Sequence, residues 1–235
     1  ECYYPDEVRN MQNTIQTRRQ EEEFALILSK FAHEIRNPVA LISSSLQIIA
    51  ASHPEAASFE GWDDIMENLE YIKELLNDVT RYSSAARIIK KPEDPAALLR
   101  SAADSVRPSL EYLGISLQTE IPDTLPVLPL DRIRIRQALL NLLRNAREAI
   151  QHSHGLIRLQ AVSLPEGVKI TVSDNGCGMT PFQLENIFRP FVSYKPEGTG
   201  LGLAVTRQII EAHGGELTAA SVPGEGTVFQ LLLRG

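Results

Sequence analysis

The stretch ALLNLLRNAREAI, residues 138–150, predicts the central helix of a globular domain. Its apolar positions are three and four residues apart and share one face of a helix that we expect to span Asp131 to Gln151. The same helix carries Asn141 and Asn145 one turn apart on one face. Two amides among so many leucines are costly to bury without hydrogen-bond partners. Either they bond to the backbone in the core, or their oxygens face a cation that holds phosphates.

On both sides of this helix the sequence alternates between helix and strand patterns. The apolar spacing predicts helices over residues 95–112 and 201–213. Alternating apolar residues predict strands over 115–121, 156–164, 168–173, 216–222 and 227–233. Helices and strands in this order predict a two-layer α/β sandwich domain.

Three glycine motifs fall at the expected loops of this domain. DNGCGM (174–179) directly follows a strand, GTGLGL (198–203) opens a helix, and GEGT (224–227) joins two strands. A glycine loop that leads into a helix presents backbone N–H groups and the positive end of the helix dipole to phosphate. Each motif alone is weak, because GEGT also fits a simple hairpin turn and GTGLGL a plain loop. Their spacing matches neither a Walker A loop nor a dinucleotide-binding fold.

The N-terminal part of the chain has a purely helical pattern. One apolar stripe consists of Phe24, Leu28, Phe31, Ile35, Val39, Ile42, Leu46 and Ile49. A second, with heptad spacing, consists of Ile65, Leu69, Ile72, Leu76 and Val79. Residues 52–61 interrupt the pattern, which predicts an α-helical hairpin. One hairpin buries only one face of each helix, so we expect two of them to form a dimeric four-helix bundle. Pro92 and Pro95 mark the expected boundary between domains 1–90 and 91–235.

Length and composition limit the classes of protein that are possible. The 235 residues leave room for two domains, and a net charge of −7 argues against nucleic-acid binding. Two cysteines far apart in sequence do not make a disulfide framework, so we expect a reducing compartment, the cytoplasm. No apolar run is long enough to span a membrane. The chain begins at Glu1 inside a helical pattern, so we expect a fragment, with any membrane link through a missing N-terminal sensor region.

Five motifs together resemble one protein family. HEIRNP (33–38), NLLRNA (141–146), DNGCGM, IFRPF (187–191) and GTGLGL occur in the order found in the catalytic core of sensor histidine kinases. The ATP-binding domain of that core resembles those of gyrase, Hsp90 and MutL. The resemblance covers about residues 24–229, and it departs from many members at Glu148, where they carry lysine. It implies a homodimer that uses ATP and Mg²⁺ to phosphorylate its own histidine and then passes the phosphoryl group to the receiver domain of a response regulator.

In the helical hairpin, the resemblance implies roles for three polar residues and one proline. His33 would accept the phosphoryl group on Nε2, and Glu34 would orient the imidazole and accept its other proton. Asn37 would polarise a water in a phosphatase reaction on the phosphorylated partner. Because His33 lies off the apolar stripe, we expect an exposed, unpaired imidazole, and we expect Pro38 to kink the helix. Solvated surface side chains and a tolerated proline would fit the same positions.

In the ATP-binding domain, the resemblance implies that Asn145 coordinates Mg²⁺ and that Asn141 lies beside the phosphates. Asp174 would accept a hydrogen bond from the adenine amino group. The other nucleotide-binding positions that it implies are Gly176, Gly178, Lys195, Gly198, Thr199, Gly200, Leu201, Gly202 and Thr227. Lys195 fits a solvated loop lysine equally well.

Residues 180–197 would form a mobile lid over the nucleotide. Phe188 and Phe191 would anchor this lid against the hairpin, although ordinary core packing explains them nearly as well.

Two other functions fit parts of the sequence. An ATPase of the gyrase and Hsp90 type needs a carboxylate to activate water, whereas the position one turn before Asn145 is Asn141. A non-catalytic dimeric scaffold would be expected to have lost motif residues, yet all of them are present. The sequence leaves open the input signal, the cognate response regulator, phosphorylation in cis or in trans, and the balance of kinase and phosphatase activity.

Overall fold

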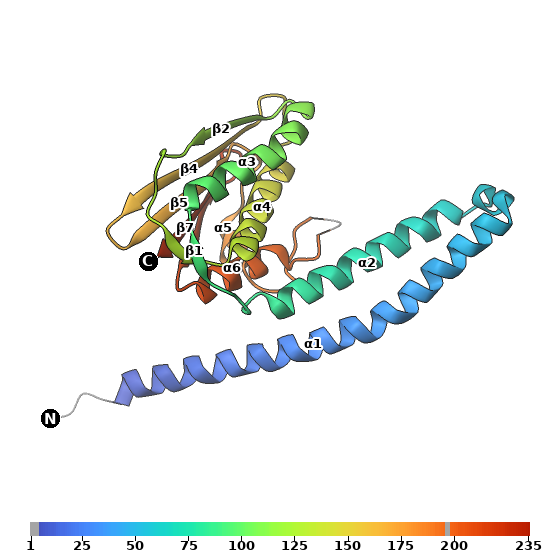
Figure 1. Ribbon diagram of the computed structural model, residues 1–235, viewed down its shortest axis with the longest axis horizontal. Coiled ribbons are helices and arrows are strands. Elements are labelled where there is room, and N and C mark those ends of the chain that lie inside the picture. The colour runs from blue at the N-terminus through green and yellow to red at the C-terminus, as the bar shows by residue number, and fades with distance from the viewer. Residues whose placement is uncertain (1–4, 196–197) are drawn as a thin grey trace. The chain divides into compact units, whose positions relative to one another are not determined.

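Helices form the N-terminal part of the chain, and a sheet covered by helices forms the rest (Figure 1). The computed structural model describes residues 5–195 and 198–235; in the first helix, side chains are described from Phe24 onward, except that of Ala25. The chain divides into two compact units, Glu1–Ser84 and Ala85–Gly235. Within the described residues, no helix is both long enough and apolar enough to cross a membrane.

The first unit is a helical hairpin, as predicted. Helix α1 (Pro5–Ser52) leads through the short 3₁₀ helix η1 (Pro54–Ser58) into helix α2 (Trp62–Ser84). Helix α1 is not interrupted at Pro38, although proline removes one backbone hydrogen bond there.

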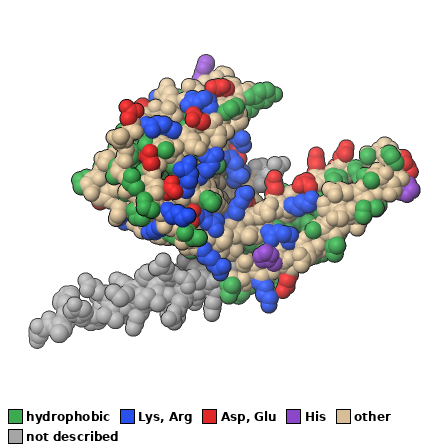
Figure 2. All heavy atoms as spheres, in the orientation of Figure 1, with side chains coloured by type: hydrophobic (Ala, Val, Ile, Leu, Met, Phe, Trp, Pro, Cys, Tyr) green, Lys and Arg blue, Asp and Glu red, His purple; other side chains and the backbone are tan. Residues whose placement is uncertain are grey.

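Only part of the predicted apolar stripe of α1 packs against α2. The core between the two helices consists of Ala32, Val39, Leu69 and Leu76, with Leu46 and Val79 partly buried beside them. By contrast, Ile35 and Ile42 in α1 are 45% and 52% exposed. The predicted stripe combines two heptad-spaced rows. Val39 and Leu46 lie in the row that faces α2, together with the small Ala32, which the prediction did not include; Ile35 and Ile42 lie in the other row. Figure 2 shows apolar side chains exposed along the hairpin.

The second unit combines a five-stranded sheet with three main helices. Its strands lie in the order β2-β4-β5-β7-β6, with β2 parallel to β4 and every other pair antiparallel. Helices α3, α4 and α6 cover one face of the sheet (Figure 1). The elements are β1 (Lys91–Glu93), α3 (Pro95–Tyr112), β2 (Ser116–Glu120), β3 (Leu128–Leu130), α4 (Arg132–Ala149), β4 (Leu156–Leu164), β5 (Gly167–Asp174), α5 (Pro181–Asn186), α6 (Gly202–Ala212), β6 (Glu216–Val222) and β7 (Gly226–Arg234).

The core of this unit lies between the sheet and the helices. Every second residue of β5 (Val168, Ile170, Val172) is buried, as are Leu139 and Leu142 of α4. The prediction of helices followed by an α/β domain is therefore confirmed. Burial of one face of each element against the other supplies the main stabilisation of such a two-layer fold.

Two local features differ from the sequence-based expectation. Helix α4 ends at Ala149 instead of Gln151, because the Ala149 carbonyl accepts the Cys177 N–H at 2.9 Å. Pro92 lies in the short strand β1, which pairs with β3, so the compact unit begins before it, at Ala85. Both differences depend on partners distant in sequence.

A buried histidine holds together the ends of the helices that carry the site. His213 follows α6, donates from Nδ1 to the Ile209 carbonyl at 2.7 Å, and accepts the Asp131 N–H on Nε2 at 2.9 Å. Burial lowers the pKa of His213, so the ring is neutral at pH 7 and can accept on Nε2. The Asp131 side chain caps α4 and also accepts the Ile89 N–H at 2.8 Å. Sequence analysis did not identify this arrangement, which fixes α4 against α6.

Candidate functional site

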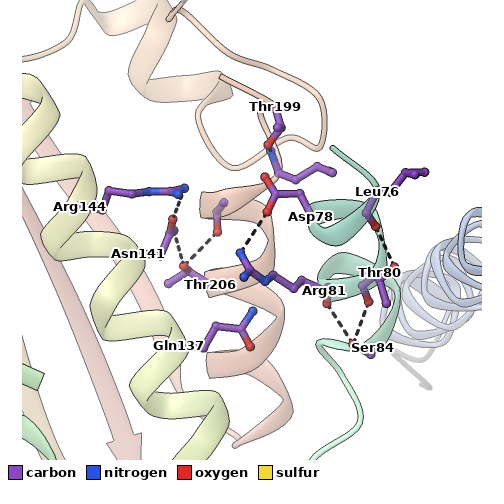
Figure 3. A network of polar contacts seen from close by, with 12 residues as sticks. Leu76, Asp78, Thr80, Arg81, Ser84, Gln137, Asn141, Arg144, Thr199 and Thr206 are labelled. Carbon is purple, nitrogen blue, oxygen red and sulfur yellow. Dashed lines mark hydrogen bonds and ion pairs between the residues drawn. The ribbon is translucent and has the colours of Figure 1, made fainter. Parts of the chain in front are cut away.

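In the hairpin, His33 is exposed as predicted, but its ring is not unpaired. Arg36 Nη1 lies 3.4 Å from His33 Nδ1, and Arg36 Nη2 donates to Thr80 Oγ1 at 2.7 Å. A guanidinium can only donate, so Nδ1 accepts in this contact and the proton of a neutral ring is on Nε2. Figure 3 shows Thr80 bonded to the Leu76 carbonyl, to which Arg36 also donates at 3.3 Å. Sequence analysis missed Arg36; its position one helical turn after His33 was the available signal.

Glu34 and Asn37 are both exposed on α1. An exposed position fits a catalytic side chain and a solvated one equally well. The roles of Glu34 in orienting His33 and of Asn37 in polarising a water therefore stay predictions.

In the α/β unit, Asp174 ends strand β5 and its carboxylate is partly buried. Asp174 Oδ1 accepts the Gly176 N–H at 2.9 Å, and the Thr227 N–H also bonds to the carboxylate. Burial raises the pKa of Asp174, and these two N–H groups and the charge of Lys195 partly offset that rise. A half-buried acceptor at the end of a strand is chemically suited to the amino group of a ligand. Thr227 is itself buried, and its hydroxyl lies 3.0 Å from Ser221 Oγ.

The loop after Asp174 is held tightly on two sides. Cys177 N–H bonds to Ala149 at the end of α4, and Gly178 has φ +64°. A Cβ on Gly178 would lie 2.0 Å from the Val222 carbonyl oxygen, so only glycine fits there. Ser221 Oγ accepts the Met179 N–H at 2.8 Å, another contact that sequence analysis missed.

Asn141 bridges helices α4 and α6 (Figure 3). Its Nδ2 donates to the buried Thr206 Oγ1 at 2.8 Å, and Thr206 donates to the Gly202 carbonyl at 3.0 Å. A Cβ on Gly202 would lie 2.6 Å from Asn141 Oδ1, so glycine allows this close approach. Arg144 Nη2 lies 3.4 Å from the same oxygen. The amide thus has a structural role between the two helices, and its place beside phosphates stays a prediction.

Asn145 and Lys195 are in direct contact. Lys195 Nζ donates to Asn145 Oδ1 at 3.3 Å and to Glu148 Oε2 at 2.5 Å. The predicted metal ligand and the predicted phosphate-binding lysine are therefore neighbours, although 50 residues separate them. Glu148 is a third member of this cluster that the sequence analysis did not assign to the site.

The GTGLGL loop leads directly into α6. Thr199 Oγ1 accepts the Leu201 N–H at 3.3 Å, and Leu201 is buried, so its side chain belongs to the core. Helix α6 has no side-chain hydrogen bond at its N-cap within the described part of the chain. Backbone N–H groups at such a helix start suit a bound phosphate. Gly198 and Gly200 lie in the same loop.

The predicted lid contains one short helix. Thr180 caps α5 through a capping box with Gln183. Phe188 packs edge-on against Phe229 with ring centroids 6.4 Å apart, which favours core packing over the anchoring role for Phe188. Pro196 and Glu197, at the end of the predicted lid, lie outside the described residues.

These residues bring together an acceptor for a base, a cation-binding pair of oxygens and a helix start for phosphates. Asp174, the Asn145 cluster and the start of α6 all belong to the second unit. Their chemistry matches the parts of a nucleotide that carries a purine amino group and a polyphosphate.

A family model described as "Histidine kinase-, DNA gyrase B-, and HSP90-like ATPase" matches residues 130–235. The sensor histidine kinase ZraS of Escherichia coli K12 is 34% identical over 219 residues, covering 92% of this chain and 47% of that protein. The alginate biosynthesis sensor protein KinB of Pseudomonas aeruginosa is 36% identical over 229 residues, covering 92% of this chain and 37% of that protein. The chain thus spans less than half the length of these curated relatives.

Two solved structures resemble the fold of this chain. Full-length ShkA in complex with AMPPNP has a TM-score of 0.71 and 25% identity, covering 88% of this chain and 46% of that chain. The catalytic domain of the histidine kinase ThkA has a TM-score of 0.57 and 29% identity, covering 62% of this chain and 95% of that chain.

Proposed function

Because this chain belongs to the sensor histidine kinases and contains their catalytic core, we propose that it transfers the γ-phosphoryl group of ATP to His33. One observation supports this proposal most strongly. Asp174, the Asn145 cluster and the start of α6 lie in one unit, and the hairpin carries an exposed histidine. The phosphoryl group then passes to an aspartate of a response-regulator receiver domain. The reaction belongs in the cytoplasm, where ATP is available.

The transfer requires a particular protonation state of His33. Nε2 attacks the γ-phosphorus, an N–P bond forms, and the bond from phosphorus to the bridging oxygen breaks, so that ADP leaves. The lone pair of Nε2 is available only when the ring proton is on Nδ1. The contact from Arg36 to Nδ1 must therefore open before transfer, and Glu34 accepts the Nδ1 proton as Nε2 is phosphorylated.

On the nucleotide side, Asp174 accepts the adenine amino group and the start of α6 receives the phosphates. Asn145 and a neighbouring oxygen would hold Mg²⁺, which when bound neutralises phosphate charge. Asn141 donates an N–H from Nδ2 to Thr206 Oγ1. Its side chain is an amide and not a carboxylate that could activate water, which argues against a gyrase-type ATPase. Asn37 lies one helical turn from His33 and would polarise a water in dephosphorylation of the partner.

The test is incubation of the chain with γ-labelled ATP and Mg²⁺. We expect label on the protein that is lost in acid and retained in base, as for a phosphorus–nitrogen bond. We also expect the label to move to a purified receiver domain when one is added. Release of labelled phosphate without a labelled protein would contradict the kinase and favour the ATPase; tight ADP binding with no turnover would favour the scaffold.

We further propose that the chain is a homodimer through its hairpin. The second heptad row of α1 (Ile35, Ile42, Ile49) is 43–52% exposed, and Ile65 and Ile72 of α2 are 49% and 38% exposed. Apolar rows of this length on one helix pair are typical of a four-helix bundle that is completed by a second copy. A dimer would bury both rows without changing the contact between α1 and α2.

The double variant Ile42→Glu/Ile72→Glu should be monomeric. Burial of one isoleucine is worth about 1.5–3 kcal/mol, and each position occurs twice in a dimer. Light scattering should give twice the 26.1 kDa chain mass for wild type and the single-chain mass for the variant. Ile133→Glu is the matched control, because Ile133 is 77% exposed outside the hairpin and its variant should stay dimeric. A wild-type monomer at micromolar concentration would refute the proposal.

A further inference from the structure

The carboxylate of Glu148 faces two different groups of cations. Its Oε1 lies 3.7 Å from Arg144 Nε and 3.6 Å from Arg147 Nη2, both in its own helix α4. Its Oε2 lies 2.5 Å from Lys195 Nζ, which comes from the segment before the glycine loop. The two arginines thus orient the carboxylate, and Oε2 is the oxygen that faces the predicted nucleotide side.

Lys195 Nζ donates both to Glu148 Oε2 and to Asn145 Oδ1, and its distance to Asn145 Oδ1 is 3.3 Å. The two oxygens come from residues three apart, which lie on the same face of a helix. A cationic group therefore already sits between one carboxylate and one amide oxygen. Mg²⁺ takes oxygen ligands, typically one or two carboxylates completed by phosphates and water, so this pair fits it.

The charge of Lys195 also reaches Asp174, where it lowers a pKa that burial raises. The ammonium is thus electrostatically coupled to both the predicted metal position and the predicted base position. A lysine that was merely solvated would not lie in contact with Asn145 and Glu148 at once.

Given the proposed function, on which this inference rests, we propose that Glu148 Oε2 and Asn145 Oδ1 form the protein side of the Mg²⁺ position. The Lys195 ammonium takes that position when the metal does not. Glu148 then makes nucleotide binding depend on metal, because a negative charge beside a polyphosphate is unfavourable unless a cation lies between them. Exchange of the ammonium for Mg²⁺ also frees Lys195 to meet the phosphates.

The test is calorimetric titration of the whole chain with ADP, in EDTA and over a series of Mg²⁺ concentrations. For wild type, Mg²⁺ should strengthen ADP binding. In Glu148→Gln, ADP should bind more tightly than to wild type in EDTA, and the Mg²⁺ affinity should fall roughly 10–100-fold, as for lost metal partners elsewhere. In Lys195→Met, Mg²⁺ should reach half of its maximal effect on ADP binding at a lower concentration, because no ammonium competes with the metal for the two oxygens. The two variants should therefore shift the Mg²⁺ dependence in opposite directions.

Glu166→Gln is the matched control, because Glu166 is exposed in the turn between β4 and β5 and its variant should behave like wild type. An unchanged Mg²⁺ dependence in Glu148→Gln, with ADP still bound, would overturn the inference and leave Glu148 as a surface ion-pair partner. Failure of wild type to bind ADP at any Mg²⁺ concentration would instead overturn nucleotide binding itself, and this inference with it.

Discussion

His33→Gln should lose all labelling from γ-labelled ATP while retaining wild-type affinity for ADP. Glutamine keeps the helix and a polar surface group, but its amide nitrogen has no free lone pair with which to attack phosphorus. Since His33 lies on the hairpin and the proposed nucleotide groups lie in the second unit, binding and transfer should separate cleanly in this variant. Labelling in the presence of Mg²⁺ and ADP calorimetry measure the two properties independently.

His53→Gln is the control for this experiment. His53 is the other histidine described in the first unit; it is exposed at the end of α1 and bonded only locally, to Glu55 at 3.2 Å. Its variant should be labelled like wild type. Label persisting in His33→Gln would place the phosphoacceptor at another residue, and label lost in both variants would show that the hairpin had been disturbed.

Asp174→Asn should weaken ADP binding by about 10–100-fold. Loss of a hydrogen bond to a charged group costs roughly 1.5–3 kcal/mol. The asparagine also fits its surroundings poorly, because the Gly176 and Thr227 N–H groups both donate to the carboxylate and an amide has only one oxygen to offer. Asp123→Asn is the control, since Asp123 is fully exposed and its variant should bind ADP normally.

The pH dependence of binding gives a second test of Asp174. Burial raises the pKa of its carboxyl, so protonation begins at a higher pH than for an ordinary aspartate. A bound adenine amino group favours the ionised form, so affinity should be greatest above the pKa of the free protein and fall as the pH is lowered through it. Asp174→Asn should lack this fall. Circular dichroism at each pH establishes that the protein remains folded, and an identical pH profile in the two proteins would exclude Asp174 as the acceptor.

Much of the α/β unit could be predicted because its signals are local. The helix around Asn145 and the strand that ends at Asp174 follow from apolar spacing, and their glycine loops follow from composition. The position of each residue on its element was therefore readable. The partner of each residue could not be read from the sequence, because Asn141 bonds to Thr206, 65 residues away, and Lys195 bonds to Glu148, 47 residues away.

The hairpin shows the same limit more sharply. Seven-residue spacing on α1 is equally satisfied by the row with Ala32 and Val39 and by the row with Ile35 and Ile42. Periodicity measures the angle between side chains on one helix and carries no information on which angle faces the partner. The choice depends on how closely two backbones approach, and the small side chain of Ala32 favours its row.

The sequence by itself determined the order of the elements, the residues at the ends of strands and helices, and the exposed position of His33. Tertiary structure decided which distant groups meet: Lys195 with Asn145 and Glu148, and the His213 ring with the Asp131 backbone N–H. Secondary structure follows from steric and hydrogen-bond preferences that act over a few residues. Pairing between distant side chains follows from the packing of whole elements, which no local pattern records.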